Sequence, residues 1–136
     1  MDTLIYSSSL FLIPINIAAI KNKYILMNVF IGLLLTSWAH HSNKHISDKN
    51  SIYDSLDNYM CYVAISITLL YALLYSSSLQ IMLYIPCLLF VYLTYQYVES
   101  NINYCKRGLE NWDCHVYHIL MHIFACLGFV TITLDF

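Results

Sequence analysis

The clearest shortage in this sequence is of charged side chains. Only 6 lysines and arginines and 8 aspartates and glutamates occur among 136 residues, so 10% of the chain is charged, whereas 60% is hydrophobic. A water-soluble domain carries about 25% charged residues. So little polar surface argues against a soluble domain, and a net charge of −2 without a basic run argues against nucleic acid as a partner. The composition predicts one transmembrane domain over residues 1–136, with membrane lipid as its partner.

The sequence also lacks the marks of a secreted, disulfide-stabilised protein. It starts Met-Asp-Thr, without a basic segment or a small-residue cleavage site, so we expect no cleaved signal peptide. Its five cysteines are odd in number, form no CxxC pair, and three of them lie in apolar runs. This pattern predicts free, buried thiols rather than a disulfide framework.

Long apolar stretches make up most of the chain. An α-helix needs about 17–25 predominantly apolar residues to cross a bilayer, and five stretches of roughly this length occur, at 4–20, 24–41, 56–77, 80–98 and 114–133. They predict an all-α, polytopic membrane helix bundle of about five transmembrane helices. Pro14 and Pro86 are expected to kink the first and fourth helices, and neighbouring helices can satisfy the carbonyls that a proline frees.

Basic residues in the connecting loops give an orientation. Cytoplasmic loops of membrane proteins carry an excess of Lys and Arg. The second and fourth loops hold four such residues and the first loop holds two: Lys44, Lys49, Lys106 and Arg107 against Lys21 and Lys23. This majority predicts that the N-terminus and the larger loops face the cytosol. The sequence does not specify the organelle, and it leaves a homo-oligomer open.

Polar and ionisable side chains gather where three of the predicted helices begin or end. If the helices cross the membrane alternately, the end of the second and the starts of the third and fifth lie on one side. The residues concerned are Ser37, His40 and His41, then Asp54 and Asp57, then His115, His118 and His122. Ionisable groups inside a membrane are costly and usually functional, so we expect a site at this side.

Helical spacing makes that site more specific. Ser37 and His41 are four residues apart and share a helix face, as do His118 and His122. Two histidines one turn apart commonly bind zinc, and a third ligand can come from another helix. The predicted zinc ligands are His41 together with the histidines of the fifth helix, His118, His122 and His115.

The order of these residues resembles the CREST superfamily, which includes alkaline ceramidases, progestin and adipoQ receptors and haemolysin III-like proteins. The matching motifs are S-x3-H at Ser37 and His41, an aspartate at Asp57, and H-x3-H at His118 and His122. The resemblance implies a membrane zinc site of three histidines, in which the Asp and Ser hold or activate water. Several members of the superfamily hydrolyse lipid amides.

The sequence departs from the superfamily in two respects. The superfamily core has seven helices, whereas this chain has five predicted ones, although losing two crossings keeps the site on one side. An aromatic residue also commonly precedes the second histidine of the last motif. The pair Tyr117-His118 fits that pattern and would place the first ligand at Cys114, whose thiolate can bind zinc. His118 belongs to both alignments, and His122, His115 and Cys114 remain alternatives for the next place.

Two functions are consistent with such a site. The first is a zinc-dependent integral-membrane hydrolase acting on a lipid amide or ester, in which Asp57 orients water or accepts its proton and Ser37 hydrogen-bonds the reacting centre. The alternative is a receptor-like or structural membrane protein in which zinc staples helices together. Ligation of b-type haem is a third interpretation, but it uses neither Ser37 nor Asp57. Whether Asp54 replaces Asp57 stays open.

Overall fold

The structure, a computed structural model, describes residues 2–42, 52–101 and 112–135. Within these ranges the chain is helical apart from short connections and contains no strand. The elements are α1 (Asp2–Ser8), the 3₁₀ turn η1 (Ser9–Phe11), α2 (Leu12–Ile20), α3 (Tyr24–Ser42), α4 (Ile52–Tyr75), α5 (Ser78–Ser100) and α7 (Trp112–Thr133). The predicted all-α class is confirmed.

Three of the described helices are long and apolar enough to cross a membrane: α4, α5 and the Cys114–Thr133 part of α7. The first predicted span, Leu4–Ile20, is a shorter apolar segment. The 19-residue α3 is not among the three, since polar residues fill its last two turns. The described residues therefore hold three candidates for membrane-spanning helices, by length and composition, where the sequence predicted about five.

Pro14 explains why the first predicted helix is divided. Proline has no N–H and its ring clashes with the carbonyl four residues earlier, here that of Leu10. The chain passes through the tighter turn η1 at this point before α2 begins. The freed Leu10 carbonyl accepts a hydrogen bond from the Cys126 thiol, with 3.3 Å from sulfur to oxygen. A neighbouring helix thus satisfies the carbonyl, as membrane helices broken by proline require.

Two tight turns reverse the chain at one end of the bundle. After α2, Asn22 adopts a left-handed conformation with φ of 57°, and the Lys23 N–H donates to the Ala18 carbonyl over 2.8 Å. This is a helix-terminating arrangement in which Asn is tolerated in place of Gly. Between α4 and α5, Ser77 and Gln80 form a reciprocal capping box, which starts α5 immediately after α4 ends.

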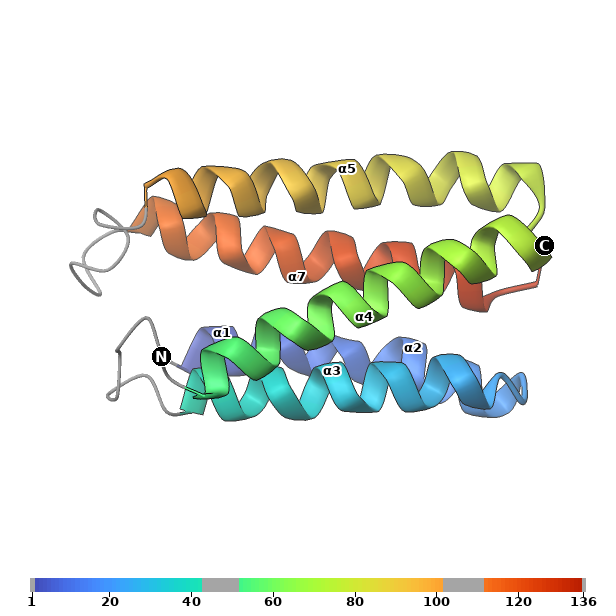
Figure 1. The fold of residues 1–136 in the computed structure, drawn as a ribbon, viewed down its shortest axis with the longest axis horizontal. Coiled ribbons are helices and arrows are strands. Elements are labelled where there is room, and N and C mark those ends of the chain that lie inside the picture. The colour runs from blue at the N-terminus through green and yellow to red at the C-terminus, as the bar shows by residue number, and fades with distance from the viewer. Residues whose placement is uncertain (1, 43–51, 102–111, 136) are drawn as a thin grey trace.

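Figure 1 shows how the helices are arranged in two groups. One group is α5 beside α7, and the other is α3 beside α1 and α2. Helix α4 crosses diagonally between the two groups. The groups meet in an apolar core where the rings of Phe30 and Phe129 stack with centroids 4.7 Å apart. Outward-facing side chains are also apolar, for example Ile20 and Met82, which are 77% and 71% exposed. A bilayer is the solvent that such a surface fits.

The end of α3 and the starts of α4 and α7 lie at the same end of the bundle (Figure 1). Contacts between side chains agree, because the His41 ring meets that of His118 and His40 Nε2 lies 3.9 Å from Asp54 Oδ1. The predicted convergence of these three segments is confirmed. We call this end of the molecule the histidine end.

Ion pairs close the opposite end. Asp135, just past α7, lies 2.7 Å from Lys23 Nζ and 3.3 Å from Lys21 Nζ. Lys23 Nζ also donates to the Thr133 carbonyl over 2.8 Å. The hydrogen bond from Lys23, supported by Lys21, holds the pKa of the Asp135 carboxyl below its usual value of 3.8. The end of α7 is thereby tied to the turn between α2 and α3.

A lowered pKa of Asp135 predicts a pH-dependent stability. The carboxylate stabilises the fold wherever pH exceeds its ordinary pKa, and the contribution is lost as pH falls through the lowered value. Asp135→Asn should therefore lower the melting temperature in detergent slightly at pH 7. The difference from wild type should begin to shrink as pH drops below about 3.8 and should vanish once pH lies below the lowered pKa of Asp135. A difference that is constant over pH 7 to 3 would contradict this assignment.

Candidate metal centre

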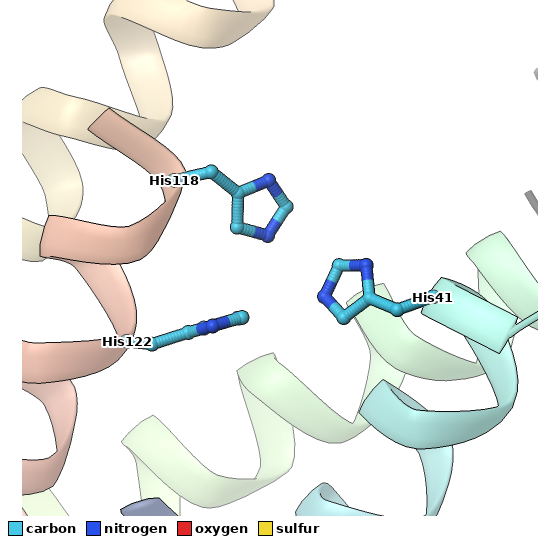
Figure 2. Close-up of side chains that lie close together, drawn as sticks. All are labelled: His41, His118 and His122. Carbon is cyan, nitrogen blue, oxygen red and sulfur yellow. The ribbon is translucent and has the colours of Figure 1, made fainter. Parts of the chain in front are cut away.

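Three histidines from two helices converge at the histidine end (Figure 2). His41 comes from the last turn of α3, and His118 and His122 lie one turn apart on α7. One ring nitrogen from each lies within 4.8 Å of the others. The ring centroids of His41 are 4.9 Å from His118 and 5.4 Å from His122, and those of His118 and His122 are 4.8 Å apart.

The chemistry of this group suits a divalent metal ion. His41 is fully buried, His122 is buried and His118 is half-buried, and clustered cationic imidazoles in such a place would repel one another. Neutral imidazoles, by contrast, are ready zinc ligands. Tetrahedral zinc with Zn–N bonds of about 2.0–2.1 Å sets its ligand nitrogens about 3.3 Å apart. The observed spacing of up to 4.8 Å is wider than this, so the rings would have to rotate toward one another to bind an ion.

The structure separates the alternatives for the metal ligands on α7. His122 is in the group with His118, whereas His115 is not. Cys114 is disulfide-bonded, so its sulfur is not available as a thiolate ligand. This bond also corrects the expectation of free thiols only, which is confirmed for Cys61, Cys87 and Cys126. The spacing of cysteines along the sequence cannot reveal the disulfide, because a disulfide depends on how segments meet in three dimensions.

Ser37 lies one turn before His41 on α3 and is buried, with 2% of its surface exposed. Its hydroxyl oxygen has no hydrogen-bond partner among the described residues. A buried hydroxyl without a partner costs free energy, so its retention needs an explanation such as a bound water or ligand. Because Ser37 lies one turn from His41, a water or ion bound by the histidine group could be this partner.

The two aspartates of α4 have different neighbours. Asp57 is half-buried and its Oδ1 accepts a hydrogen bond from Thr36, the residue before Ser37, over 3.4 Å. Asp54 lies nearer the start of α4 and faces His40. Neither carboxylate belongs to the three-histidine group. Asp57 therefore lies beside Thr36 near the end of α3, outside the histidine group.

The N-terminal segment contributes residues that the sequence analysis missed. Ser7 Oγ lies 2.8 Å from His122 Nδ1, and the Phe11 ring meets the His122 ring edge-on with centroids 5.7 Å apart. The signal was available in the serine run 7–9. Alternate crossings place the start of the first helix on the same side as the end of the second.

Comparisons with known proteins add nothing to this geometry: no protein-family model, no curated protein and no solved structure matches the chain.

The histidine group predicts metal binding at about one ion per chain. His118→Ala removes one of three donors and should weaken binding by more than the 10–100-fold that losing an outer hydrogen-bond partner typically costs. His115→Ala is the matched control, because His115 lies on the same helix outside the group. Elemental analysis and chelator competition on purified protein measure both. Equal metal contents in the two variants would remove the basis of the site.

Proposed function

We propose that the chain is a zinc-dependent integral-membrane hydrolase that acts on a lipid amide or ester, as a ceramidase does. The observation that carries this proposal is a group of three imidazoles from two helices, two of them buried and one half-buried, with no fourth His, Cys, Asp or Glu in the group within the described ranges. Catalytic zinc sites have three protein ligands and keep the fourth position for water or substrate, whereas structural sites are closed. A haem would use two axial histidines and leave the third without a role.

Zinc held by His41, His118 and His122 would supply Lewis acidity and lower the pKa of water to about 7. The chain's own residues would do the rest. Asp57 would accept the proton of the attacking water, and its hydrogen bond from Thr36 orients the carboxylate. Ser37 would donate its hydrogen bond to the oxyanion that develops on the substrate carbonyl.

A lipid substrate fits the surroundings of the site. The cavity between α4, α5 and α7 is lined almost wholly by apolar side chains, among them Ile65, Leu88 and Phe124, but its volume of about 20 Å³ holds about one water molecule. The larger apolar surface is the outward-facing side of the same helices, where Leu73, Met82 and Leu89 are exposed. These helices are also the three that can cross a membrane. We propose that an acyl chain lies along this outward-facing apolar surface while the amide or ester is presented to the polar residues of the histidine end.

The proposed relationship to the CREST superfamily has the same basis. The resemblance rests on the sequence order of Ser37, His41, Asp57, His118 and His122. The arrangement of the side chains supports it, because the three histidines lie together and Asp57 contacts the residue before Ser37. A shortened member of the superfamily would keep this constellation and have less protein surrounding a lipid.

A zinc staple is the alternative function. The histidine group joins α3 to α7, and α1, η1 and α2 also pack against both of these helices. A metal ion there would fix the two helices directly, as in a receptor-like or structural protein. The staple needs neither Asp57 nor Ser37, which separates it from the hydrolase.

Asp57→Asn distinguishes the two functions. The variant keeps the size of the side chain and removes the proton acceptor, so we expect full zinc content and at least about 100-fold slower turnover of ceramide-like amides or phospholipid esters in micelles. Ser37→Ala should slow turnover by about 100-fold or more, as expected for loss of an oxyanion donor. Thr131→Ala, at the far end of α7, is the control. Zinc-loaded wild type that turns over none of these lipids would leave the staple.

The orientation in the membrane is a separate proposal. The four-to-two division of basic residues favours a cytosolic histidine end, but Cys114, at this same end, is disulfide-bonded. Disulfides persist in oxidising compartments and are rare in the cytosol. Because the charge excess is small, we give the disulfide more weight and propose that the histidine end faces an oxidising compartment.

Labelling from one side of the membrane tests this orientation. Ser42 ends α3 at the histidine end, Ser78 starts α5 at the other, and both are exposed. With a membrane-impermeant maleimide on sealed vesicles of known sidedness, Ser42→Cys should react from the non-cytosolic face and Ser78→Cys only from the cytosolic face. Permeabilised vesicles are the control for reactivity. The reverse pattern would restore the cytosolic assignment.

A further inference from the structure

The two hydrogen bonds of Ser7 bear on which nitrogen of His122 carries a proton. Ser7 Oγ donates to the Leu4 carbonyl over 3.1 Å and lies 2.8 Å from His122 Nδ1. A serine hydroxyl has one proton and two acceptor lone pairs. If that proton is given to Leu4, the bond to His122 requires that Nδ1 carry a proton and donate it to Ser7.

A neutral imidazole has one N–H and one bare nitrogen. With the proton on Nδ1, the lone pair of His122 is on Nε2. A metal ligand needs this lone pair, and the hydrogen bond made by the other ring nitrogen fixes both tautomer and ring orientation. Ser7 is 8% exposed and His122 is 5% exposed, so water competes little for this bond.

We propose that Ser7 is the positioning residue of the metal centre: it holds His122 in the Nδ1–H tautomer and so presents Nε2 to the metal. This inference rests on the metal site of the proposed function and extends it to the N-terminal helix, which the zinc motifs do not include. A typical zinc-ligating histidine donates its second N–H to a carboxylate, a backbone carbonyl or water. Here a serine hydroxyl on another helix takes that part.

The segment that carries Ser7 is anchored on both helices of the site. Trp38 of α3 donates from Nε1 to Ser9 Oγ over 3.2 Å, and Cys126 of α7 donates to the Leu10 carbonyl. Phe11 is buried against His122. These contacts fix α1 and η1 against α3 and α7, so the hydroxyl of Ser7 stays within reach of His122 without help from the metal.

The chain offers an internal control in the neighbouring Ser8. Ser8 is fully buried and also donates to the Leu4 carbonyl, over 2.8 Å, but within the described part of the chain its hydroxyl is bonded to backbone carbonyls and not to a histidine. Ser7→Ala should weaken zinc binding by about 10–100-fold in chelator competition, whereas Ser8→Ala should stay within about twofold of wild type.

Thr and Val separate the hydroxyl from the shape of the side chain. Ser7→Thr keeps the hydroxyl and should bind zinc with wild-type affinity. Ser7→Val has nearly the shape of Ser7→Thr without the hydroxyl, and it should bind zinc as weakly as Ser7→Ala. In metal-free protein with ¹⁵N-labelled histidine, His122 should be in the Nδ1–H tautomer in wild type and Ser7→Thr. In Ser7→Val that tautomer should no longer dominate.

The outcomes separate failure of this inference from failure of the metal site. If wild type binds zinc and all Ser7 variants bind it equally well, the site stands and the role of Ser7 is overturned. An Nε2–H tautomer for His122 in metal-free wild type would overturn it as well. If wild type binds no zinc, the metal site and the role of Ser7 both fall. Equal losses in Ser7→Ala and Ser8→Ala would show a structural effect of α1 and also overturn it.

Discussion

The placement of three imidazoles side by side in an apolar helix bundle is the constraint on which the rest of the structure depends. Imidazoles are polar, and a bilayer offers no water to satisfy them. His41 and His122 are nonetheless buried, in a bundle that contains three long apolar helices. Such an arrangement is costly unless hydrogen bonds or a metal satisfy the nitrogens. The surrounding polar residues, from Ser7 to Asp57, are arranged around that requirement.

The broken N-terminal segment is part of the answer to this constraint. An unbroken helix over residues 4–20 would need an N–H at position 14 to satisfy the Leu10 carbonyl, and proline has none. The chain tightens into η1 before Pro14, and the Cys126 thiol takes the free carbonyl. The same contact region holds Ser7 and Phe11 against His122. The break in the N-terminal helix and the hydrogen bond to His122, a candidate metal ligand, thus occur in the same part of the molecule.

The two ends of the bundle differ in how their polar groups are used. At the far end, capping and ion pairing close the turns: Asn22 terminates α2, Ser77 and Gln80 start α5, and Lys23 holds Asp135. Gln80 Nε2 also donates to the Thr131 and Leu134 carbonyls, which satisfies carbonyls at the end of α7 that have no partner within the helix. The histidine end has polar groups aimed inward instead, consistent with a site where a ligand is bound.

Much of the architecture could be predicted from the sequence because the physics is local. Apolar length determined the helices, and α3, α5 and α7 lie within two residues of their predicted bounds. The alternate crossing of helices and the four-residue spacing of His118 and His122 were sufficient to predict that three histidines lie together. The number of membrane-spanning helices was less accessible, since the first apolar stretch is interrupted and α3 ends in polar residues.

The sequence by itself therefore determined the helical class, the approximate helix bounds and the side on which the polar residues gather. Each of these depends on spacing along one chain. Only the tertiary structure decided that His122 joins His118 while His115 does not, that Cys114 is in a disulfide, and that Ser7 meets His122. The physical reason is that helix rotation and the approach of distant segments are set by packing. Ser7 and His122 are 115 residues apart in the chain, so the serine run 7–9 can place Ser7 on the right side of the membrane but cannot show that it meets His122.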